Sequence, residues 1–301
     1  MRIFLTGSTG YIGSGVLDAF VKGGHEVTAL VRDANRGRRV KGRGATPHVA
    51  DLGDVEAWRD AARGHDAWVH AAAESSPRGP QLDALAIDGI LQAAASGDRP
   101  GAFVYTSGVW VLGPTSTPAA EDAPLNPLPL VAWRPAHEAR VLAAAGDGLR
   151  TAVIRPGVVY GGTRGIVADL FKDGENGLIR VVGDGNNRWA LVYERDLADL
   201  YVKVTTLPGA SGVYHATDEG DERVGDIVET IARNVKTPAD VRRIPIEEAR
   251  AKMGAYADAL AVDQVVRSPR ARALGWVPSL RSVGGNVPRL LEEWRSGRER
   301  R

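Results

Sequence analysis

The stretch that decides the fold is Gly7-Ser8-Thr9-Gly10-Tyr11-Ile12-Gly13. It follows a short apolar run, residues 3–6, that favours a β-strand, and it opens a segment in which Ile12, Val16 and Phe20 recur at helical spacing. Glycines at such a strand-to-helix turn let backbone N–H groups approach a phosphate pair closely, and the helix adds the positive end of its dipole. The stretch therefore predicts a βαβ unit with a dinucleotide site, a purely structural glycine turn being the alternative.

The first half of the chain repeats this strand-and-helix rhythm. Further short apolar runs, at residues 26–31, 67–72, 102–106 and 151–155, alternate with helix-length segments rich in alanine and charged residues. Such alternation is typical of βαβ units and a parallel sheet. After about Gly157 the pattern loosens into glycine-rich loops, and separate helical stretches follow near residues 196–204, 224–234 and 282–294.

These patterns predict an α/β protein with a Rossmann-type doubly wound parallel sheet and a smaller C-terminal α/β substrate lobe. A chain of 301 residues is long enough for two such lobes. We expect the dinucleotide-binding domain to span residues 1–157 and the substrate lobe residues 158–301. A segment of about 186–206 is expected to return to the first domain.

Composition narrows the classes of partner. The 38 Lys and Arg residues against 37 Asp and Glu residues leave a formal charge of +1, which provides no overall positive field to hold a nucleic acid. With no cysteine, and with six histidines that form no H-x-x-x-H pair, we expect no disulfide and no metal site. No run approaches the roughly 18 apolar residues that a membrane span needs. We therefore expect a cytoplasmic protein, with no membrane partner, that acts on a small molecule and is a possible homodimer.

Further motifs stand at the ends of the expected strands. They are Asp51-Leu52-Gly53-Asp54, Val69-His70-Ala71-Ala72-Ala73, Tyr105-Thr106-Ser107-Gly108 and Ile154-Arg155-Pro156-Gly157-Val158-Val159-Tyr160-Gly161, with Leu274-Gly275-Trp276-Val277-Pro278 near the end. Together with the G-x-x-G-x-x-G spacing of the first loop, they resemble the extended short-chain dehydrogenase/reductases of the NAD-dependent epimerase/dehydratase group. The resemblance covers essentially the whole chain.

The resemblance implies a set of cofactor and substrate positions. It places Asp51 and Leu52 beside the adenine, Ala71 to Ala73 beside the phosphates and ribose, and the segment after Pro156 against the nicotinamide; strand-end capping and core packing are the alternative roles. The expected cofactor contacts are Gly7, Thr9, Gly10, Tyr11, Ile12, Gly13, Arg32, Asp51, Leu52, Ala71, Ala72, Ala73, Thr106, His137, Pro156 and Val158. The expected substrate pocket comprises Ser75, Gly108, Trp110, Trp133 and Tyr160.

The tip of the second expected strand bears on the choice between NAD(H) and NADP(H). An acidic residue there would accept the ribose 2′-OH, whereas a cation would pair with a 2′-phosphate. In the family register the tip is Val31, which accepts no hydrogen bond, and Arg32, Arg36 and Arg38 follow. This favours NADP(H) over NAD(H). In the alternative, Asp33 accepts the ribose hydroxyl and the arginines form a solvated basic loop.

The resemblance fails at the family's catalytic pair. Family enzymes place a Tyr-x-x-x-Lys pair on one helix face, but here the corresponding residues are Trp133-Arg134-Pro135-Ala136-His137-Glu138. The family's Ser/Thr falls on Gly108, and a helix asparagine falls on Ala86. Because an indole does not titrate usefully, Trp133 cannot be the acid or base, and we expect it to form an aromatic wall.

The remaining candidates for proton transfer are His137, Tyr193 and Ser107. An imidazole titrates near neutral pH, so His137 is either a proton donor, a ribose contact or a structural histidine. Tyr193 stands where relatives often carry His, although strand tyrosines usually pack. We also expect Pro135 to mark a helix start, Arg134 to meet an anionic substrate or stay solvated, and Asp196 to be an N-cap.

Three functions fit this sequence. The first is an atypical NADP(H)-binding oxidoreductase or epimerase-like enzyme that acts on a small hydroxyl- or carbonyl-bearing molecule. The second is a non-redox isomerase, lyase or cyclase on the same scaffold. The third is a dinucleotide-responsive regulatory binding protein without chemistry. The fold alone does not decide among them.

Overall fold

The computed structural model describes residues 1–95, 100–146 and 148–299, and the chain divides into two compact units. Unit 1 comprises Met1–Ser107, Trp133–Arg155 and Leu197–Tyr214, and unit 2 comprises Gly108–Ala132, Pro156–Asp196 and His215–Arg301. The chain passes from unit 1 to unit 2 after Arg155. The segment that returns to unit 1 is 197–214 rather than about 186–206.

One further segment departs from the expected division, because residues 108–132 cluster with unit 2. The side-chain amide of Gln264 explains this placement: its Nε2 donates to the carbonyls of Val109 and Gly113, at 2.9 and 2.8 Å. These partners are more than 150 residues away in sequence. No local pattern in the sequence carries such a contact.

Unit 1 is built on a seven-stranded Rossmann-type sheet, which confirms the predicted fold class. The strand order is β10-β6-β5-β4-β1-β2-β3, and the pairs from β6 through β3 are parallel. The strands are β1 (Arg2–Thr6), β2 (Glu26–Val31), β3 (Thr46–Val49), β4 (Ala67–His70), β5 (Gly101–Thr106), β6 (Leu149–Pro156) and β10 (Gly212–Ala216). Central strands are buried on both faces, as parallel sheets require.

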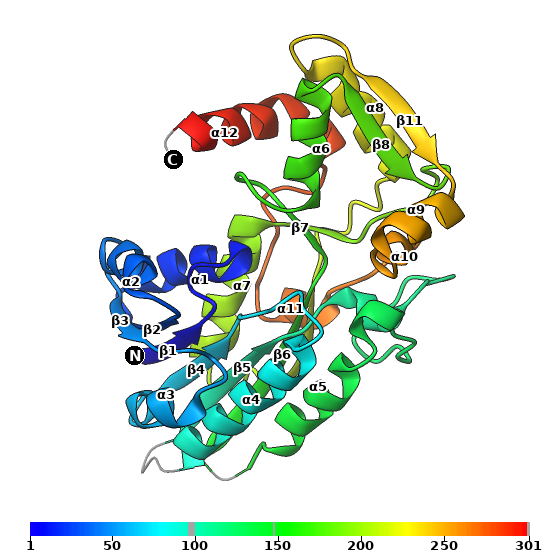
Figure 1. Cartoon of the computed structure of the whole chain (residues 1–301). Helices are drawn as coiled ribbons and strands as arrows, with labels where there is room; N and C mark the ends of the chain where they lie inside the picture. The colour runs from blue at the N-terminus through cyan, green and yellow to red at the C-terminus, as the bar shows by residue number, and fades with distance from the viewer. Residues whose placement is uncertain (96–99, 147, 300–301) are drawn as a thin grey trace. The chain divides into compact units, whose positions relative to one another are not determined.

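Helices cover both faces of this sheet. They are α1 (Tyr11–Lys22), α2 (Ala34–Lys41), α3 (Val55–Ala62), α4 (Gly79–Ala95), α5 (Arg134–Ala143) and α7 (Glu194–Thr206). Figure 1 shows α1, α2 and α7 on one face and α3, α4 and α5 on the other. The predicted stripe of α1 buries Val16 and Phe20, and the helix ends at Gly23. Pro135 lies in the first turn of α5, as predicted.

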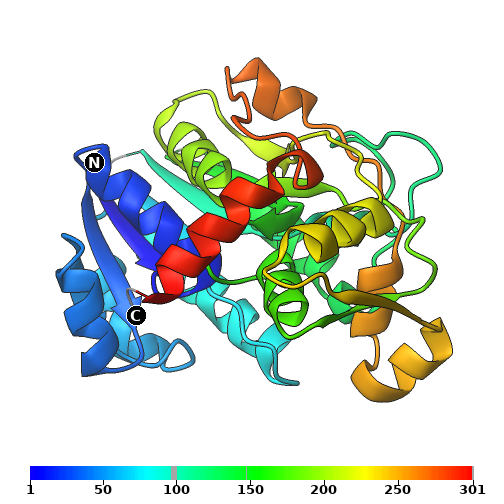
Figure 2. The same cartoon turned by 90° about the horizontal axis from the view of Figure 1, so that it is seen from above.

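Unit 2 contains two short parallel strand pairs and its own helical core. The pairs are β7 (Val158–Tyr160) with β9 (Leu191–Tyr193), and β8 (Leu178–Val182) with β11 (Asp240–Ile244). Its helices are α6 (Ile166–Glu175), α8 (Val224–Asn234), α9 (Ile246–Met253), α10 (Tyr256–Ala261), α11 (Pro269–Ala273) and α12 (Val287–Glu299), with 3₁₀ turns η1 (Val109–Leu112), η2 (Pro129–Val131) and η3 (Gly284–Asn286). The helices α6, α8 and α12 pack together around Phe171, Ile231 and Trp294 (Figures 1 and 2).

The prediction that Asp196 is a helix N-cap is wrong. The helix α7 begins at Glu194, so Asp196 lies inside its first turn. The Asp196 carboxylate instead accepts hydrogen bonds from the Ser279 backbone and hydroxyl at 2.8 and 2.7 Å, and from the Leu280 N–H at 3.2 Å. This buried acid therefore anchors a distant loop of unit 2, a role that helix-start statistics do not detect.

A second buried acid of unit 2, Asp218, lies just after β10 and is only 1 % exposed. Its carboxylate accepts hydrogen bonds from the Tyr160 hydroxyl at 3.1 Å and the Gly220 N–H at 2.9 Å. Burial raises the pKa of Asp218 to about 7, and these two bonds offset that effect only in part. The folded protein therefore holds a proton on Asp218 that the unfolded chain, with the ordinary aspartate pKa, releases near pH 4.

This arrangement predicts a pH-dependent stability. Between about pH 4 and pH 7 the native state binds more protons than the unfolded state, so the free energy of unfolding falls as pH rises. Asp218→Asn keeps the hydrogen-bonding shape without the charge. As the pH rises from 5 to 8, we expect the free energy of unfolding of the variant to increase by about 3 kcal/mol relative to that of the wild type. Urea denaturation of both proteins at the two pH values measures this, and a difference that does not change with pH would contradict it.

Candidate cofactor and active site

The glycine loop packs its backbone directly against the end of a neighbouring strand. Gly7 has a φ of +76°, and a Cβ on it would lie 2.4 Å from the carbonyl carbon of Ala71 at the end of β4. A Cβ on Gly13 would lie 2.2 Å from the Gly7 carbonyl oxygen. The Gly10 N–H donates to that same oxygen at 2.8 Å. No side chain larger than hydrogen fits at Gly7 or Gly13.

The N-terminus of α1 is suited to an anion. Its N-cap, Gly10, has no side chain to accept the first helical N–H groups, and its first turn contains no acidic residue. The adjacent Ser8 hydroxyl is buried and has no hydrogen-bond partner within the described residues. A helix N-terminus with no capping side chain, its dipole and the unsatisfied hydroxyl of Ser8 fit the phosphates of a dinucleotide. Thr9, Tyr11 and Ile12, the other predicted contacts of this loop, are partly buried.

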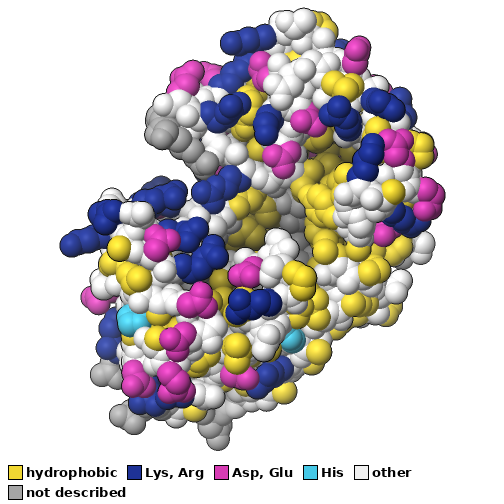
Figure 3. All heavy atoms as spheres, in the orientation of Figure 1, with side chains coloured by type: hydrophobic (Ala, Val, Ile, Leu, Met, Phe, Trp, Pro, Cys, Tyr) yellow, Lys and Arg dark blue, Asp and Glu magenta, His cyan; other side chains and the backbone are white. Residues whose placement is uncertain are grey.

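The two charged residues just after β2, Arg32 and Asp33, differ in their contacts. Asp33 caps α2: its carboxylate accepts the Arg36 N–H at 2.8 Å and pairs with the Arg36 guanidinium at 2.9 Å. The backbone N–H of Arg36 is the main reason that the pKa of Asp33 lies below its usual value. Arg32 is exposed and makes no ion pair in the described part of the chain. Figure 3 shows basic side chains gathered over this region of α2.

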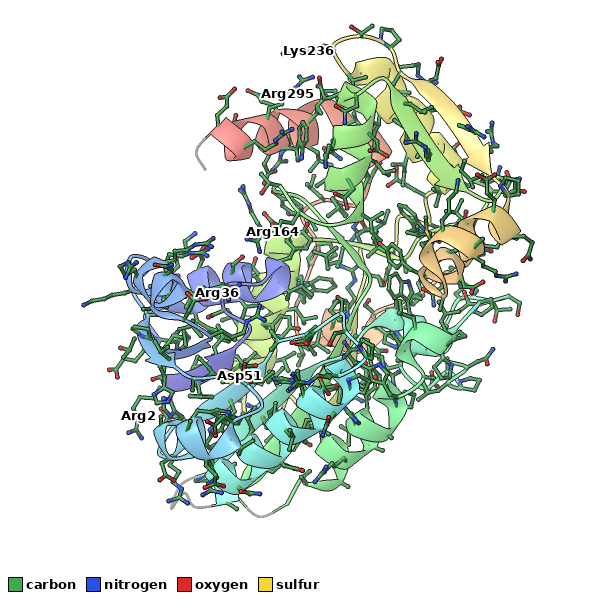
Figure 4. The ribbon with its side chains drawn as sticks, viewed as in Figure 1. Arg2, Arg36, Asp51, Arg164, Lys236 and Arg295 are labelled. Carbon is green, nitrogen blue, oxygen red and sulfur yellow. The ribbon has the colours of Figure 1, made fainter. Side chains whose placement is uncertain are left out.

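Asp51 and Leu52 follow the carboxyl end of β3, which lies next to β2 in the sheet. Asp51 is exposed and accepts the Gly53 N–H at 2.9 Å, so its carboxylate is held in an Asx turn. The Leu52 carbonyl accepts the Trp58 indole N–H. Figure 4 shows the positions of Asp51 and of Arg36, which come from the segments after β3 and β2. Both segments follow strands at the carboxyl edge of the sheet, where ligands of open α/β sheets bind.

A pocket of unit 1 lies beside the segment that follows β4. It is lined by Leu52, Ala72, Ala73, Glu74, Gly79, Leu82, Asp83, Trp133 and Arg134. The predicted residues Ala72, Ala73, Leu52 and Trp133 therefore meet at one place. Ala71, against which Gly7 packs, immediately precedes this wall. Ser75 lies exposed in the segment that follows.

The pocket contains a charged residue that the sequence analysis missed, Asp83 on α4. Its side chain is 5 % exposed and accepts three hydrogen bonds. These come from His137 Nδ1 at 2.7 Å, the Tyr105 hydroxyl at 2.8 Å and His70 Nε2 at 3.2 Å. Burial would raise the pKa of Asp83, but the bonds from the two histidines and the charge of Arg134 outweigh it and hold the pKa well below the usual range. The available signal was an acid in the helical series Asp83, Ile87 and Ile90, whose other members are apolar and buried.

Trp133 and Arg134 form the edge of the same pocket at the start of α5. The Arg134 guanidinium lies 4.4 Å from the Trp133 ring centroid, and the Trp133 and His137 rings meet edge-on at 4.9 Å. One nitrogen of Arg134 donates to the Thr106 carbonyl at 3.0 Å and to the Tyr105 hydroxyl at 3.2 Å. Arg134 is therefore a fixed cation on the pocket wall and not a freely solvated side chain.

The adjacent Glu138 is part of the packing of unit 1. It is buried and pairs with the buried Arg155, whose Nε lies 3.1 Å from both carboxylate oxygens. Thr106 bonds to the Tyr201 hydroxyl at 2.5 Å, and the buried Ser107 hydroxyl has no partner among the described residues. Ser107 thus lies at the end of β5 with an unused donor.

The remaining predicted residues belong to unit 2. Tyr193 is 1 % exposed, donates to the Glu293 carboxylate, and has a pKa raised to about 12, mainly by burial. Tyr160 is fully buried against Asp218. Trp110 contacts the Tyr256 ring edge-on. The other unit 2 positions are Gly108, Pro156 and Val158.

Two other kinds of feature are not found among the residues that the structure describes. No group of three or more His, Cys, Asp or Glu side chains among them is arranged to hold a metal ion. Within the same residues, no helix combines the length and the apolar character needed to cross a membrane.

Comparison with known proteins gives matches over most of the chain. The model of the NAD dependent epimerase/dehydratase family matches residues 3–218. A 2-alkyl-3-oxoalkanoate reductase from Stenotrophomonas maltophilia is 31% identical over 229 residues, which cover 70% of this chain and 68% of the relative.

Solved structures share the fold. The human epimerase family protein SDR39U1, solved with NADPH, superimposes with a TM-score of 0.79 at 21% identity and covers 97% of this chain and 99% of its own. A Thermus thermophilus UDP-glucose 4-epimerase, solved with NAD, gives a TM-score of 0.81 at 22% identity, covering 98% and 99%. At these identities the likeness establishes the architecture alone.

The geometry of the glycine loop predicts the effect of a single methyl group. In Gly13→Ala the new Cβ meets the Gly7 carbonyl oxygen and must displace the loop, so we expect the affinity for NADPH and NADH to fall at least about tenfold, equivalent to roughly 1.4 kcal/mol. Gly209→Ala is the matched control, because a Cβ there meets nothing within 4 Å. Cofactor fluorescence titration of both variants measures the change. Equal affinities for the two variants would contradict the assignment of the loop.

Proposed function

Because this chain belongs to the NAD dependent epimerase/dehydratase family, we propose that it is an NADP(H)-linked oxidoreductase acting on a small carbonyl- or hydroxyl-bearing molecule. The observation that carries this proposal is the continuity of the site in unit 1. Gly7 packs against Ala71, and the following Ala72 and Ala73 line the pocket that holds Asp83, Trp133 and Arg134. A cofactor held by the glycine loop and extending along β4 would therefore lie beside ionised and aromatic groups.

The preference for NADP(H) is supported by the groups after β2. Asp33, the alternative acceptor for a ribose hydroxyl, is already occupied by the α2 N-terminus and by Arg36. Arg32 is exposed beside it and remains available for a 2′-phosphate. The human structure with NADPH is consistent with this preference, whereas the Thermus structure with NAD leaves NAD(H) as the alternative.

A carbonyl substrate is supported by the relative that reduces a 2-alkyl-3-oxoalkanoate and by the fixed cation of the pocket. When bound, NADP(H) would supply or accept the hydride. The side chain of Trp133 shields the pocket from water, and Arg134 stabilises negative charge that develops on a carbonyl oxygen. Neither group donates a proton in this reaction, since an indole does not titrate and a guanidinium keeps its proton.

The test of this function is hydride transfer. We expect a panel of small ketones and 3-oxoacid derivatives to include at least one whose reduction consumes NADPH and carries deuterium from C4-deuterated NADPH into the product. Conversion of a substrate with no deuterium transfer and no loss of NADPH absorbance would favour the non-redox alternative. The reason to keep the non-redox alternative is that Trp133 and His137 stand where the resemblance expects the family's Tyr and Lys.

The cofactor preference gives a separate prediction. Arg32→Ala should weaken NADPH binding about ten- to a hundredfold, equivalent to the roughly 1.5–3 kcal/mol of a charge-assisted hydrogen bond, and should leave NADH binding within twofold. Arg39→Ala, on the exposed side of α2, is the matched control for loss of one positive charge. Calorimetric titration with both cofactors measures the ratio. If Arg32→Ala lowered the affinities for NADPH and NADH equally, Arg32 would not be the residue that recognises the 2′-phosphate.

A further inference from the structure

We propose that the buried carboxylate of Asp83 positions His137 as the proton donor of this site, in place of the family's Tyr-x-x-x-Lys pair. The proposal rests on the proposed function and names the residue that completes it. In the direction of reduction His137 gives a proton to the carbonyl oxygen, and in the reverse direction it takes one back. Asp83 is a positioning residue, because it acts through the imidazole.

The two histidines bound to Asp83 differ in what remains free. His70 is 1 % exposed and uses both ring nitrogens, Nε2 on Asp83 and Nδ1 on the Thr6 hydroxyl at 2.6 Å. His137 uses Nδ1 on Asp83, and no hydrogen bond of its Nε2 is found among the described residues. Its side chain is 16 % exposed. His70 is therefore fixed inside the protein, whereas His137 has one nitrogen left for a ligand.

The contact with Asp83 also determines the tautomer of His137. An ionised carboxylate only accepts hydrogen bonds, so the proton of neutral His137 lies on Nδ1 and the lone pair on Nε2. When Nε2 is protonated as well, its N–H is the one that can face a ligand, because Nδ1–H stays on Asp83. A buried carboxylate that orients an imidazole in this way is the arrangement used for acid–base catalysis by histidine in other folds.

The position of His137 links it to the pocket. Its ring contacts the Trp133 ring edge-on, and both Trp133 and Asp83 line the pocket beside Ala72 and Ala73. Tyr105, which donates its hydroxyl to Asp83, is fully buried. Burial together with the charge of Asp83 raises the pKa of Tyr105 far above the usual tyrosine value. Tyr105 thus holds Asp83 and Arg134 in place and is not itself an acid near neutral pH.

In the reduction, bound NADPH would supply the electrons and His137 the proton. When bound, NADPH would supply a hydride with its two electrons to the carbonyl carbon and would thereby be oxidised to NADP⁺, while the π electrons of the C=O bond would move to the oxygen. That oxygen takes the proton from Nε2 of the imidazolium, giving the alcohol. His137 is left neutral with its Nδ1–H on Asp83, and water returns the proton to Nε2.

The first test needs no substrate. In two-bond ¹H–¹⁵N spectra of the ¹⁵N-histidine-labelled protein, loss of a signal in His137→Gln assigns the residue among six histidines. We expect neutral His137 to show the Nδ1–H pattern, and we expect Asp83→Asn to convert it to a mixture or to the Nε2–H form. His48→Gln serves as a control, because His48 lies on β3 and bonds to the carbonyl of Ala57 on α3, and it is not among the partners of Asp83. An Nε2–H pattern in the wild type would overturn the proposal.

The second test uses a ketone reduced by the wild type. We expect His137→Gln to lower kcat about a hundredfold or more, the usual effect of a general acid, with the dissociation constant for NADPH changed by less than threefold. Added imidazole should restore turnover in His137→Ala. Asp83→Asn should lower kcat less, and imidazole should not restore it. His48→Gln should match the wild type.

The outcomes separate the two proposals. Full turnover in His137→Gln, with hydride transfer intact, would refute the role of His137 and leave the oxidoreductase function standing. Absence of reduction for every carbonyl tested would refute the function, and the catalytic role would fall with it even if the tautomer is the expected one. Thermal melting of each variant identifies loss of activity that comes from unfolding, and a folded, inactive His137→Ala that imidazole restores supports the proposal.

Discussion

The close approach of the Gly7 backbone to Ala71 is the constraint on which the site depends. It brings the turn after β1 against the end of β4, with no room for a Cβ between them. The loop then places the N-terminus of α1, free of acidic residues, beside the carboxyl edge of the sheet. Because the segment after β4 continues from this contact into the pocket wall, the glycine loop and the ionised pocket are joined through one backbone segment.

The second constraint is the burial of a charge. Asp83 is ionised inside unit 1 because three donors and a nearby cation compensate the loss of hydration. A buried carboxylate of this kind also limits the orientations of its neighbours, since each polar side chain around it must point a hydrogen-bond donor toward it. The cluster therefore fixes the orientation of Tyr105, His70 and His137 together, and Arg134 is fixed through Tyr105. Trp133 and His137 therefore belong to one connected arrangement with Asp83 and Arg134.

Much of the fold was predictable because it rests on local patterns. The apolar runs marked β1, β2 and β5 to within one residue, since strands buried on both faces read as continuous apolar segments. The helix α8 was predicted with its observed bounds. Less was predictable at Asp196 and at residues 108–132, where a side chain bonds to partners far away in sequence.

By itself the sequence determined the class of fold and the glycine loop after β1, because both depend on residue types at short spacing. Only the tertiary structure decided that Asp83 holds His137, since the two residues are 54 positions apart on α4 and α5. It also decided that Asp33 is occupied while Arg32 is exposed, and that Arg134 is anchored on the pocket wall. The physical reason is that the partners of a buried charge are set by tertiary packing. Packing brings together elements that are far apart in the chain, and no local sequence pattern shows which elements will meet.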